Sequence, residues 1–191
     1  MKLTRSQQRK LVSAVITLIV ILLGGYTLNQ PQQETVTVGP VDPGYYRVVT
    51  FSDGDTISVD MNGTEEKIRM IGVDTPETHH PSKPVQCFGR AASAFTKEFI
   101  GTKPVRLEAD PLNDNRDRYG RLLRYVYTPD GKMLNRELIA QGYGFAYTSF
   151  PLEKSDEFQK LEDNARDKNL GLWGGCDIVT NSYGSSESTP E

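Results

Sequence analysis

Apolar and polar positions alternate in five short segments of the chain, and these segments predict β-strands. The first three are YYRVVTF, TISVDM and KIRMIGV, and the later two are KPVRLEA and GRLLRYVYT. Each is rich in β-branched or aromatic residues, which favour strands. The pairs Asp53-Gly54 and Asn62-Gly63 separate the first three segments and are typical of hairpin turns. The sequence therefore predicts a meander of three strands, followed after an insertion by two more.

Three other segments have the period of amphipathic helices. In CFGRAASAFTKEFI the apolar face consists of Phe88, Ala91, Ala92, Phe95 and Phe99. MLNRELIAQGY predicts a shorter helix that Gly142 ends. EKSDEFQKLEDNARDKNLGLW predicts a last one, with Phe158, Leu161 and Ala165 on one side. The order fits an α+β fold, a five-stranded Greek-key barrel of the OB type with three helices. Such a barrel suggests binding of oligonucleotides or oligosaccharides, although a fold alone does not fix function.

The longest apolar run lies near the N-terminus. Residues 11–28 carry no charge, and four basic residues precede them within residues 1–10. A helix of this length measures about 27 Å, close to the thickness of a hydrocarbon core. No A-x-A-like cleavage site follows, which favours a transmembrane signal anchor over a cleaved signal peptide. The basic residues predict that residues 1–10 lie in the cytoplasm and that the rest of the chain lies outside.

Composition divides the remainder into three parts. Residues 29–44 are polar and rich in Pro and Gly, which predicts a linker. Residues 45–177 hold every predicted strand and helix of the barrel and form one domain. Residues 178–191 are rich in Ser, Thr and Glu, which predicts a disordered tail. We expect a monomer that crosses the cell membrane once with its domain outside the cytoplasm, or a secreted protein if the N-terminal segment is cleaved.

The charge of the chain bears on its partner. Residues 1–29 hold four of the 22 Lys and Arg and none of the 25 Asp and Glu, so 18 basic and 25 acidic side chains remain, a net charge of −7. A protein that binds duplex DNA by bulk attraction is usually basic. If this domain binds nucleic acid, local groups or a bound cation must provide the attraction.

The two cysteines, Cys87 and Cys176, are far apart in the sequence. Disulfides persist outside the cytoplasm, and a bridge here would close a loop of about 90 residues, worth roughly 4 kcal/mol in the chain-entropy model. The alternative is a zinc site that includes His79 and His80, although the spacing matches no common zinc pattern. The disulfide is the favoured interpretation.

Charged side chains gather near the ends of the predicted strands. Arg69 lies within an apolar strand, Asp74 and Glu77 follow that strand, and Asp55 and Arg121 lie beside the beginnings of two others. Considered alone, the DTPE motif is also compatible with a capping turn. Each arginine, considered alone, is compatible with a position on the solvated surface. Taken together, three carboxylates can hold a hard divalent cation and two guanidiniums can clamp the phosphate that it polarises.

Several motifs carry a resemblance to a known family. DGDT, IRMIGVDTPET, ASAFTKEF, DRYGRLLRYVY and DGKMLNRELIAQGY occur in one order over about Val48 to Trp173. They closely resemble the staphylococcal nuclease (thermonuclease) family. The resemblance implies an OB barrel with three helices and calcium-dependent cleavage of single-stranded or loosened DNA and of RNA.

The same resemblance implies ligands for Ca²⁺. Asp55 and Asp74 match the carboxylates that bind the ion, and Thr75 matches the residue whose main-chain carbonyl is a ligand. Asp53 is similar to a carboxylate that supports these ligands without touching the ion. These assignments make calcium the expected cofactor.

The resemblance also implies roles in catalysis and substrate binding. Glu77 matches the residue that holds the attacking water and is called the general base, and Arg69 and Arg121 match the arginines that clamp the phosphate. The residues expected to contact the nucleotide are Tyr119, Tyr147 and the neighbouring Arg118. Some exported relatives resemble this chain in having a cysteine pair placed like Cys87 and Cys176.

Two departures from the family pattern concern substrate contacts. Ser149 stands where the type member has a second tyrosine, and Phe150 follows it. The stretch THHPSKPVQC is less basic than the flexible loop of the type member, which helps to grip polymeric substrate. Stacking and processivity are therefore expected to differ.

The sequence as a whole predicts an extracytoplasmic calcium-dependent nuclease that hydrolyses phosphodiester bonds of DNA and RNA and leaves 3′-phosphate ends. The alternatives are a non-catalytic OB-fold module that binds nucleic acid and an adaptor for DNA uptake at the cell surface. Non-catalytic modules typically lose the carboxylates or the arginines. All five are present here, which favours the enzyme.

Overall fold

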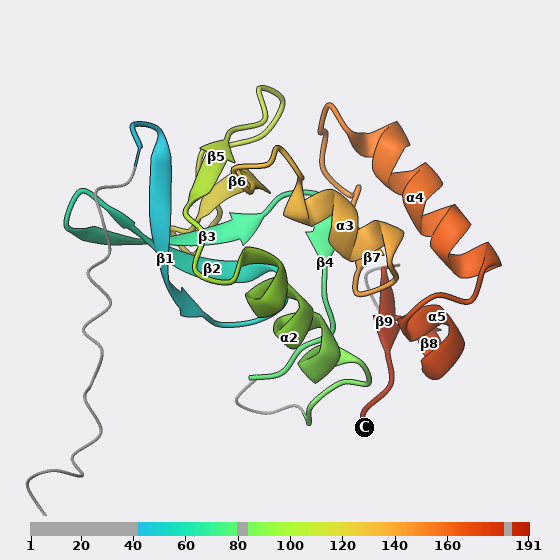
Figure 1. The fold of residues 1–191 in the computed structure, drawn as a ribbon. Coiled ribbons are helices and arrows are strands. Elements are labelled where there is room, and N and C mark those ends of the chain that lie inside the picture. The colour runs from blue at the N-terminus through green and yellow to red at the C-terminus, as the bar shows by residue number, and fades with distance from the viewer. Residues whose placement is uncertain (1–41, 80–83, 182–184) are drawn as a thin grey trace, which may run out of the picture. The chain divides into compact units, whose positions relative to one another are not determined.

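Five strands close into a barrel in the computed structural model, which describes residues 42–79, 84–181 and 185–191 (Figure 1). The strands are, in their order around the barrel, Tyr45–Phe51 (β1), Thr56–Met61 (β2), Thr64–Met70 (β3), Leu122–Tyr127 (β6) and Val105–Glu108 (β5). Their pairs are antiparallel except β3 with β6, which run parallel. The predicted five-stranded barrel of the OB type is therefore confirmed.

The predicted cytoplasmic segment and membrane helix, and most of the predicted linker, fall within residues 1–41, outside the described residues. In the part of the chain that the structure describes, none of the helices combines the length and the apolar character needed to cross a membrane.

The turns at the ends of β2 form where the sequence predicts them. Asn62 and Gly63 have φ angles of 57° and 87°, the left-handed conformation that a two-residue hairpin requires. At the other end, the N–H groups of Ser52 and Asp53 both donate to the Thr56 carbonyl, at 3.0 and 3.3 Å. This second turn reverses the chain immediately before β2 and places Asp55 at the end of the barrel.

Helices cover one side and one end of the barrel (Figure 1). They are Gly89–Ile100 (α2), Leu134–Ala140 (α3), Ser155–Asp167 (α4) and the four-residue Leu172–Gly175 (α5). The three predicted helices are confirmed, except that the last predicted segment divides into α4 and α5. The division has a local cause, because Asn169 and Gly171 have φ angles of 52° and 56°, which a continuous helix does not allow.

Gly142 ends α3 as expected, with a φ angle of 72°. Its carbonyl accepts a hydrogen bond of 2.8 Å from the Leu172 N–H, and a Cβ on Gly171 would lie only 2.2 Å from that carbonyl oxygen. Only glycine allows the two backbones to approach so closely. The contact joins the end of α3 to the beginning of α5.

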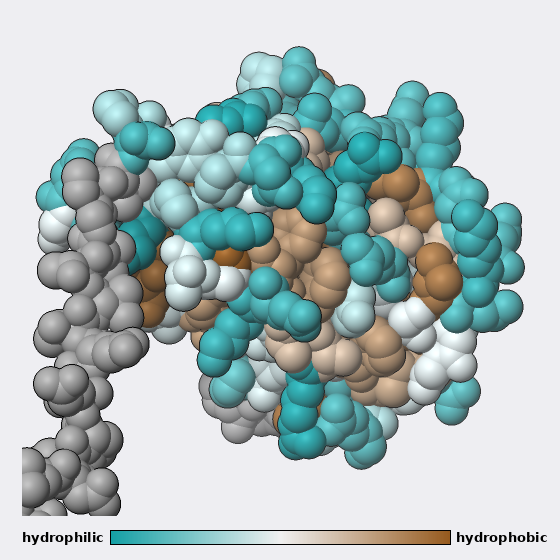
Figure 2. Space-filling view, viewed as in Figure 1, coloured by the Kyte–Doolittle hydropathy of each residue, from teal (hydrophilic) through white to brown (hydrophobic). Residues whose placement is uncertain are grey.

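The hydrophobic core fills the barrel and continues between the barrel and the helices. Its fully buried side chains include Ile57, Val59, Ile68, Val105 and Val126 from the strands, and Ile100, Leu138, Ile139 and Phe158 from the helices. Hydrophilic side chains cover the outer face of α4, whereas apolar surface gathers toward the middle of the same view, over α2 and α3 (Figure 2). The predicted apolar face of α4 is buried at Phe158 and Ala165, whereas in α2 Ala92 is buried and Phe95 and Phe99 are only partly buried against the core.

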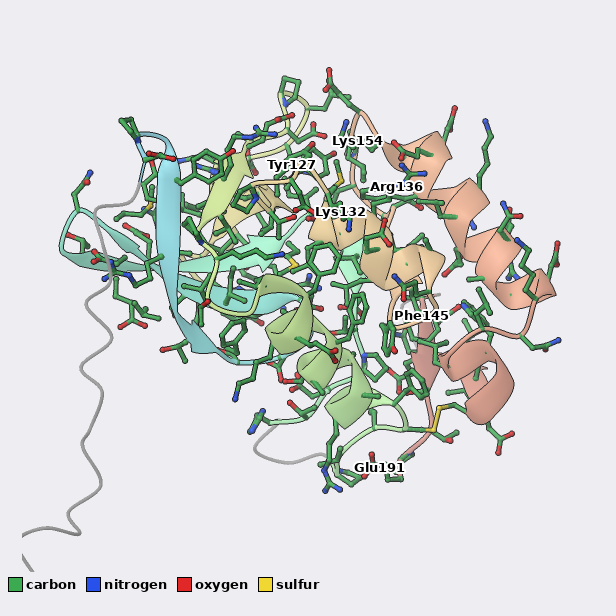
Figure 3. All side chains as sticks on the ribbon, viewed as in Figure 1. Tyr127, Lys132, Arg136, Phe145, Lys154 and Glu191 are labelled. Atoms are coloured by element: carbon green, nitrogen blue, oxygen red, sulfur yellow. A yellow bond between two sulfur atoms is a disulfide. The ribbon has the colours of Figure 1, made fainter. Side chains whose placement is uncertain are left out.

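Two small sheets lie outside the barrel. Val73–Asp74 (β4) pairs with Phe145–Ala146 (β7), with Asp74 opposite Phe145. The ring of Phe145 points into the space between α3 and α5 (Figure 3) and meets Trp173 edge-on, with 5.3 Å between the ring centres. This packing holds the short β4 strand, and Asp74 with it, against the helical layer.

The prediction of a disordered tail in residues 178–191 is wrong for the described residues 178–181 and 185–191. Ile178–Thr180 (β8) pairs with Ser186–Ser188 (β9), and the chain beyond β9 pairs with the segment before α2 through a bridge between Gln86 and Pro190. Composition alone missed this, because the pairing uses main-chain groups, which every residue type but proline has in full. The folded domain therefore extends beyond the predicted boundary at residue 177.

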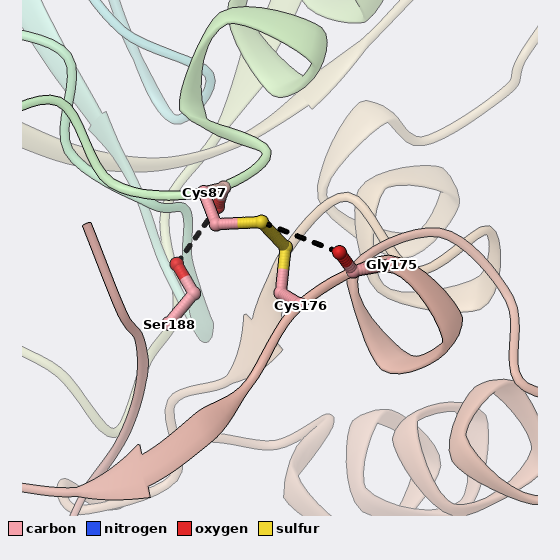
Figure 4. The surroundings of a disulfide bond; sticks show 4 residues. All are labelled: Cys87, Gly175, Cys176 and Ser188. Carbon is pink, nitrogen blue, oxygen red and sulfur yellow. Dashed lines mark hydrogen bonds between the residues drawn. A yellow bond between two sulfur atoms is a disulfide. The ribbon is translucent and has the colours of Figure 1, made fainter. Parts of the chain in front are cut away.

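The predicted disulfide is confirmed. Cys87 and Cys176 are bonded to each other, with Cα atoms 5.9 Å apart (Figure 4). The alternative of a zinc site is wrong for these cysteines, because neither sulfur is a free thiolate. Beside the bridge, the Ser188 hydroxyl donates to the Cys87 carbonyl at 2.8 Å. The disulfide thus ties the segment before α2 to the C-terminal strands.

A buried carboxylate joins the end of β5 to β6 and to the segment before α4. Asp110 is 3% exposed, and it accepts hydrogen bonds from the Tyr125 hydroxyl and from the N–H groups of Leu112 (2.8 Å) and Glu153 (2.9 Å). Burial alone would raise the pKa of Asp110, but these hydrogen bonds outweigh it and lower the pKa. Burial and the bond to Asp110 raise the pKa of Tyr125.

We expect Asp110→Asn to lower the free energy of unfolding by about 2 kcal/mol at neutral pH, because an amide cannot accept all three bonds without leaving a buried group unpaired. A lowered folded-state pKa stabilises the protein above the unfolded value of about 3.9, and this contribution is lost as pH falls below it. The difference in unfolding free energy between wild type and the variant should therefore become smaller under acid conditions. Urea titrations of both proteins at neutral and acid pH would measure it. Asp167→Asn, at the exposed end of α4, is the control, and an equal loss in the two variants would contradict the expectation.

Candidate active site

Asp55 lies at the end of the barrel, one residue before β2, and is 5% exposed. Its Oδ2 accepts hydrogen bonds from the N–H and the hydroxyl of Thr75, at 2.8 and 3.1 Å, and its Oδ1 accepts one from the Thr56 hydroxyl at 2.9 Å. The Asp55 carbonyl also accepts a bond of 2.9 Å from Met70 N–H. Asp55 therefore links the DGDT turn to the end of β3 and to the chain that follows β4.

Arg69 reaches both of the predicted calcium-binding carboxylates. It lies opposite Thr56 in the pairing of β2 with β3, and its Nη1 is 3.3 Å from Asp55 Oδ2 while its Nη2 is 2.6 Å from Asp74 Oδ1. Nη1 also donates to the carbonyl of Val73 at 2.6 Å. Burial opposes its charge, but Asp55 and Asp74 outweigh that effect and raise the pKa of Arg69. The guanidinium therefore stays charged between two carboxylates.

Asp74 completes this ion-pair cluster from β4. Loss of water around its carboxylate raises the pKa of Asp74, and the negative charges of Asp55, Glu77 and Glu187 raise it further, against the opposing effect of Arg69. The side chain is nevertheless 44% exposed, so part of the carboxylate still faces solvent. The arrangement leaves an excess of negative charge that a further cation would offset.

Glu77 lies beside this cluster without touching it through any hydrogen bond or ion pair of the described residues. Its Oε1 accepts hydrogen bonds from the N–H groups of Thr78 and His79, at 2.9 and 2.8 Å. Its charge is among the causes that raise the pKa of Asp74. Glu77 thus presents a fixed carboxylate at the edge of the cluster.

Asp53 supports the Glu77 loop and has no contact with Asp55 among the described residues. Its Oδ1 accepts a hydrogen bond from the Thr78 hydroxyl and lies 3.3 Å from His79 Nδ1. These contacts place Asp53 behind Glu77, and its predicted support of the calcium ligands stays a prediction.

Arg121 lies next to β6 and is held by a partner that sequence reasoning missed. Its Nε donates to Asp117 Oδ2 at 2.6 Å and its N–H to Asp117 Oδ1 at 3.0 Å. Asp117 is also among the charges that raise the pKa of Arg69. The spacing of four residues between Asp117 and Arg121 was the available signal. The structure does not bring Arg121 into contact with Asp55 or Asp74.

The aromatic residues predicted to bind the nucleotide, Tyr119 and Tyr147, each lie beside another ring or a guanidinium. Tyr119 is 68% exposed, and Arg118 and Arg121 lie 4.8 and 5.3 Å from the centre of its ring. Tyr147 also contributes to the raised pKa of Arg69, and its ring centre is 5.9 Å from that of Phe150. Phe150, which follows the Ser149 departure, is exposed and extends the aromatic surface beyond Tyr147.

The donor groups of the site fit a hard divalent cation. No group of three or more His, Cys, Asp and Glu side chains in the described ranges forms a metal site by itself. The expected ligand set differs from such a group, because it consists of two carboxylates and the Thr75 carbonyl, all oxygen donors. One guanidinium reaches both carboxylates, so both lie around one position. Calcium accepts irregular oxygen ligation and completes its shell with water.

Comparison with known proteins agrees with this geometry. A family model described as "Staphylococcal nuclease homologue" matches residues 67–175. The chain is 42% identical over 129 residues to a thermonuclease of Staphylococcus intermedius, covering 67% of this chain and 75% of the relative. It is 37% identical over 161 residues to a thermonuclease of Staphylococcus hyicus, covering 83% and 93%. It is 42% identical over 131 residues to Endonuclease YncB of Bacillus subtilis (strain 168), covering 68% and 61%. With its closed barrel and the cluster at its end, the chain belongs to the staphylococcal nuclease family.

Proposed function

We propose that this protein is a calcium-dependent nuclease that acts outside the cytoplasm, hydrolyses phosphodiester bonds of DNA and RNA, and leaves 3′-phosphate ends. Its thermonuclease and endonuclease relatives support a nuclease function. The observation that carries the proposal is the position of Arg69, whose guanidinium lies between Asp55 and Asp74 at 3.3 and 2.6 Å. The guanidinium that would bind the phosphate and the two carboxylates that would bind the metal ion therefore lie together.

Asp55, Asp74 and the Thr75 carbonyl are the groups that would hold Ca²⁺, which when bound polarises a phosphate oxygen and offsets the charge of the carboxylates. Arg69 and Arg121 bind the other phosphate oxygens and stabilise the charge that grows on them in the transition state. In the structure, Arg69 is paired with Asp55 and Asp74, and Arg121 is paired with Asp117, which fixes the position of both guanidiniums.

The chemical step is an in-line displacement by water. Glu77 orients the water and accepts its proton as the new P–O bond forms. The bond between phosphorus and the 5′-oxygen breaks, and the leaving oxygen takes up a proton from solvent, to which Glu77 later releases the proton that it accepted, so that the 3′-oxygen retains the phosphate. Tyr119, Arg118 and Tyr147 contact the nucleotide, and the exposed ring of Phe150 adds a surface for a neighbouring base.

The location is part of the same proposal. The uncharged run in residues 11–28 supports a single membrane anchor with the domain outside the cytoplasm, or secretion if the anchor is cleaved. The bond between Cys87 and Cys176 supports an oxidising compartment, because disulfides are rare in the cytoplasm. We further propose that the protein acts as a monomer.

The proposal predicts that the purified protein degrades heat-denatured DNA when Ca²⁺ is present and stops when a chelator is added. Products should carry 5′-hydroxyl ends, which polynucleotide kinase labels without prior phosphatase treatment. A restored activity after Ca²⁺ is added back is the control for irreversible loss.

If DNA binds but remains intact in Ca²⁺, the protein is a binding module. If an Arg69→Ala, Arg121→Ala double variant binds DNA fully, a surface adaptor is the better description.

A further inference from the structure

Both main-chain polar groups of Glu77, its N–H and its carbonyl, are hydrogen-bonded to one residue, Gln86. The Glu77 N–H donates to the side-chain Oε1 of Gln86 at 2.7 Å, and the Gln86 N–H donates to the Glu77 carbonyl at 2.9 Å. The side chain of Gln86 thus takes the place of a strand carbonyl. Both polar groups of the Glu77 backbone are satisfied by a residue that lies nine positions along the chain.

The carboxylate of Glu77 depends on this backbone for its direction. Its Oε1 is bound by the N–H groups of Thr78 and His79, so the side chain folds back onto the peptide units that immediately follow it. The same backbone packs against the beginning of α2, where a Cβ on Gly89 would lie 3.0 Å from the Glu77 carbonyl oxygen. A rotation of the Glu77 peptide would therefore redirect the carboxylate.

Gln86 is in turn held by the C-terminal strap, the name used here for the described residues 177–181 and 185–191. Gln86 bridges Pro190, and its neighbours are bound on either side. The Glu191 N–H donates to the Val85 carbonyl at 2.9 Å, and the Cys87 N–H donates to the Thr189 carbonyl at 2.8 Å. The disulfide adds a covalent tie at Cys87.

The far end of the C-terminal strap is fixed as well. Glu191 lies beside the beginning of α2 (Figure 3), where its carboxylate is 3.2 Å from Arg90 Nη1. Within the strap, the Thr189 N–H donates to the Asp177 carbonyl at 3.0 Å. The strap is therefore anchored at its start by the disulfide and at its end by Arg90, with Gln86 between the two anchors.

We propose that Gln86 is a positioning residue for Glu77, and that the C-terminal strap and the disulfide hold Gln86 in the register that this requires. The inference rests on the proposed function of Glu77 in orienting and deprotonating water. Gln86 touches neither the phosphate nor the ligand carboxylates, so it acts through Glu77. Its effect falls on the rate of the chemical step, because a misplaced base slows proton transfer without weakening substrate binding.

The test compares Gln86→Met, which keeps the size of the side chain and removes the acceptor, with Gln86→Glu, which keeps an acceptor oxygen. We expect Gln86→Met to lower kcat about tenfold and to change KM less than twofold, and Gln86→Glu to recover most of the loss. Ca²⁺ affinity measured by calorimetry should stay within about twofold in both variants, because Asp55, Asp74 and Thr75 do not contact Gln86 in the described structure. Gln141→Met, which removes an exposed glutamine bond on α3, is the matched control.

Amide hydrogen exchange at Glu77 provides a readout that needs no activity. Its N–H should exchange at least about tenfold faster in Gln86→Met, because its acceptor is gone, and should return toward the wild-type rate in Gln86→Glu. A kcat within twofold of wild type in Gln86→Met, or an equal loss in both variants, would overturn the inference. If wild type itself leaves DNA intact, the proposed function fails, and unchanged exchange at Glu77 then overturns the positioning role separately.

Discussion

Glu77→Gln is expected to lower kcat by roughly a thousandfold, which is within the range for loss of a general base. The substitution is well suited to the question, because a glutamine Oε1 can still accept from the N–H groups of Thr78 and His79, at present 2.9 and 2.8 Å away. The loop should therefore keep its conformation while the side chain loses its charge and its basicity. Steady-state hydrolysis of denatured DNA at saturating Ca²⁺ would measure the loss.

The control for this substitution is Glu137→Gln, which makes the same chemical change on α3, where the carboxylate pairs with Gln141 on the exposed surface. It should retain wild-type kcat. Thermal unfolding of both variants should remain within about 2 °C of wild type, because neither change opens the core. A kcat for Glu77→Gln within tenfold of wild type would exclude Glu77 as the general base and leave the arginines and the cation as the main source of catalysis.

Removal of the disulfide should produce the largest loss of stability. Cys87 and Cys176 are separated by 89 positions, and a crosslink over such a loop contributes about 4 kcal/mol in the chain-entropy model. The Cys87→Ser, Cys176→Ser double variant should therefore unfold about 10 °C below wild type. The loss has a second component, because the bridge also fastens the C-terminal strap to the segment before α2.

Chemical reduction separates the effect of the bond from that of the serines. Wild-type protein treated with a thiol reductant should fall to the midpoint of the double variant, and the reductant should leave the double variant unchanged. Before reduction, neither cysteine should react with an alkylating reagent. Reactive thiols in protein isolated under oxidising conditions, or a loss below about 1 kcal/mol, would contradict the assignment.

The barrel and much of the site could be predicted because their signals are local. The Asn62-Gly63 and Asp53-Gly54 pairs mark turns on their own, and strands that alternate in polarity must place one face toward a core. Arg69, Asp74 and Glu77 lie within nine positions of one another, so their closeness in the sequence already keeps them in one region of the fold. Their types then indicate the chemistry.

The features that could not be predicted depend on long-range partners. Nothing local distinguishes the tail that contains Ser186 to Ser188 from a disordered one, because its order comes from main-chain pairing with Val85 and Cys87 and from the disulfide. The choice of partner for each arginine could not be predicted either, although distance in the sequence is not the cause, because Asp117 lies only four positions from Arg121. Arg121 has Asp117 for its ion pair, whereas Arg69 is paired with both predicted carboxylate ligands, and composition does not decide between such choices.

The parallel pairing of β3 with β6 has a consequence for the newly made chain. Arg69 lies opposite Leu123 in that pair, and Asp74 lies opposite Phe145 in the pairing of β4 with β7. A ribosome-bound chain therefore exposes Asp55, Arg69 and Glu77 long before the strands that align them have been synthesised. The bond to Cys176 forms later still. The cluster can therefore reach its final arrangement only after β6 and β7 have been synthesised.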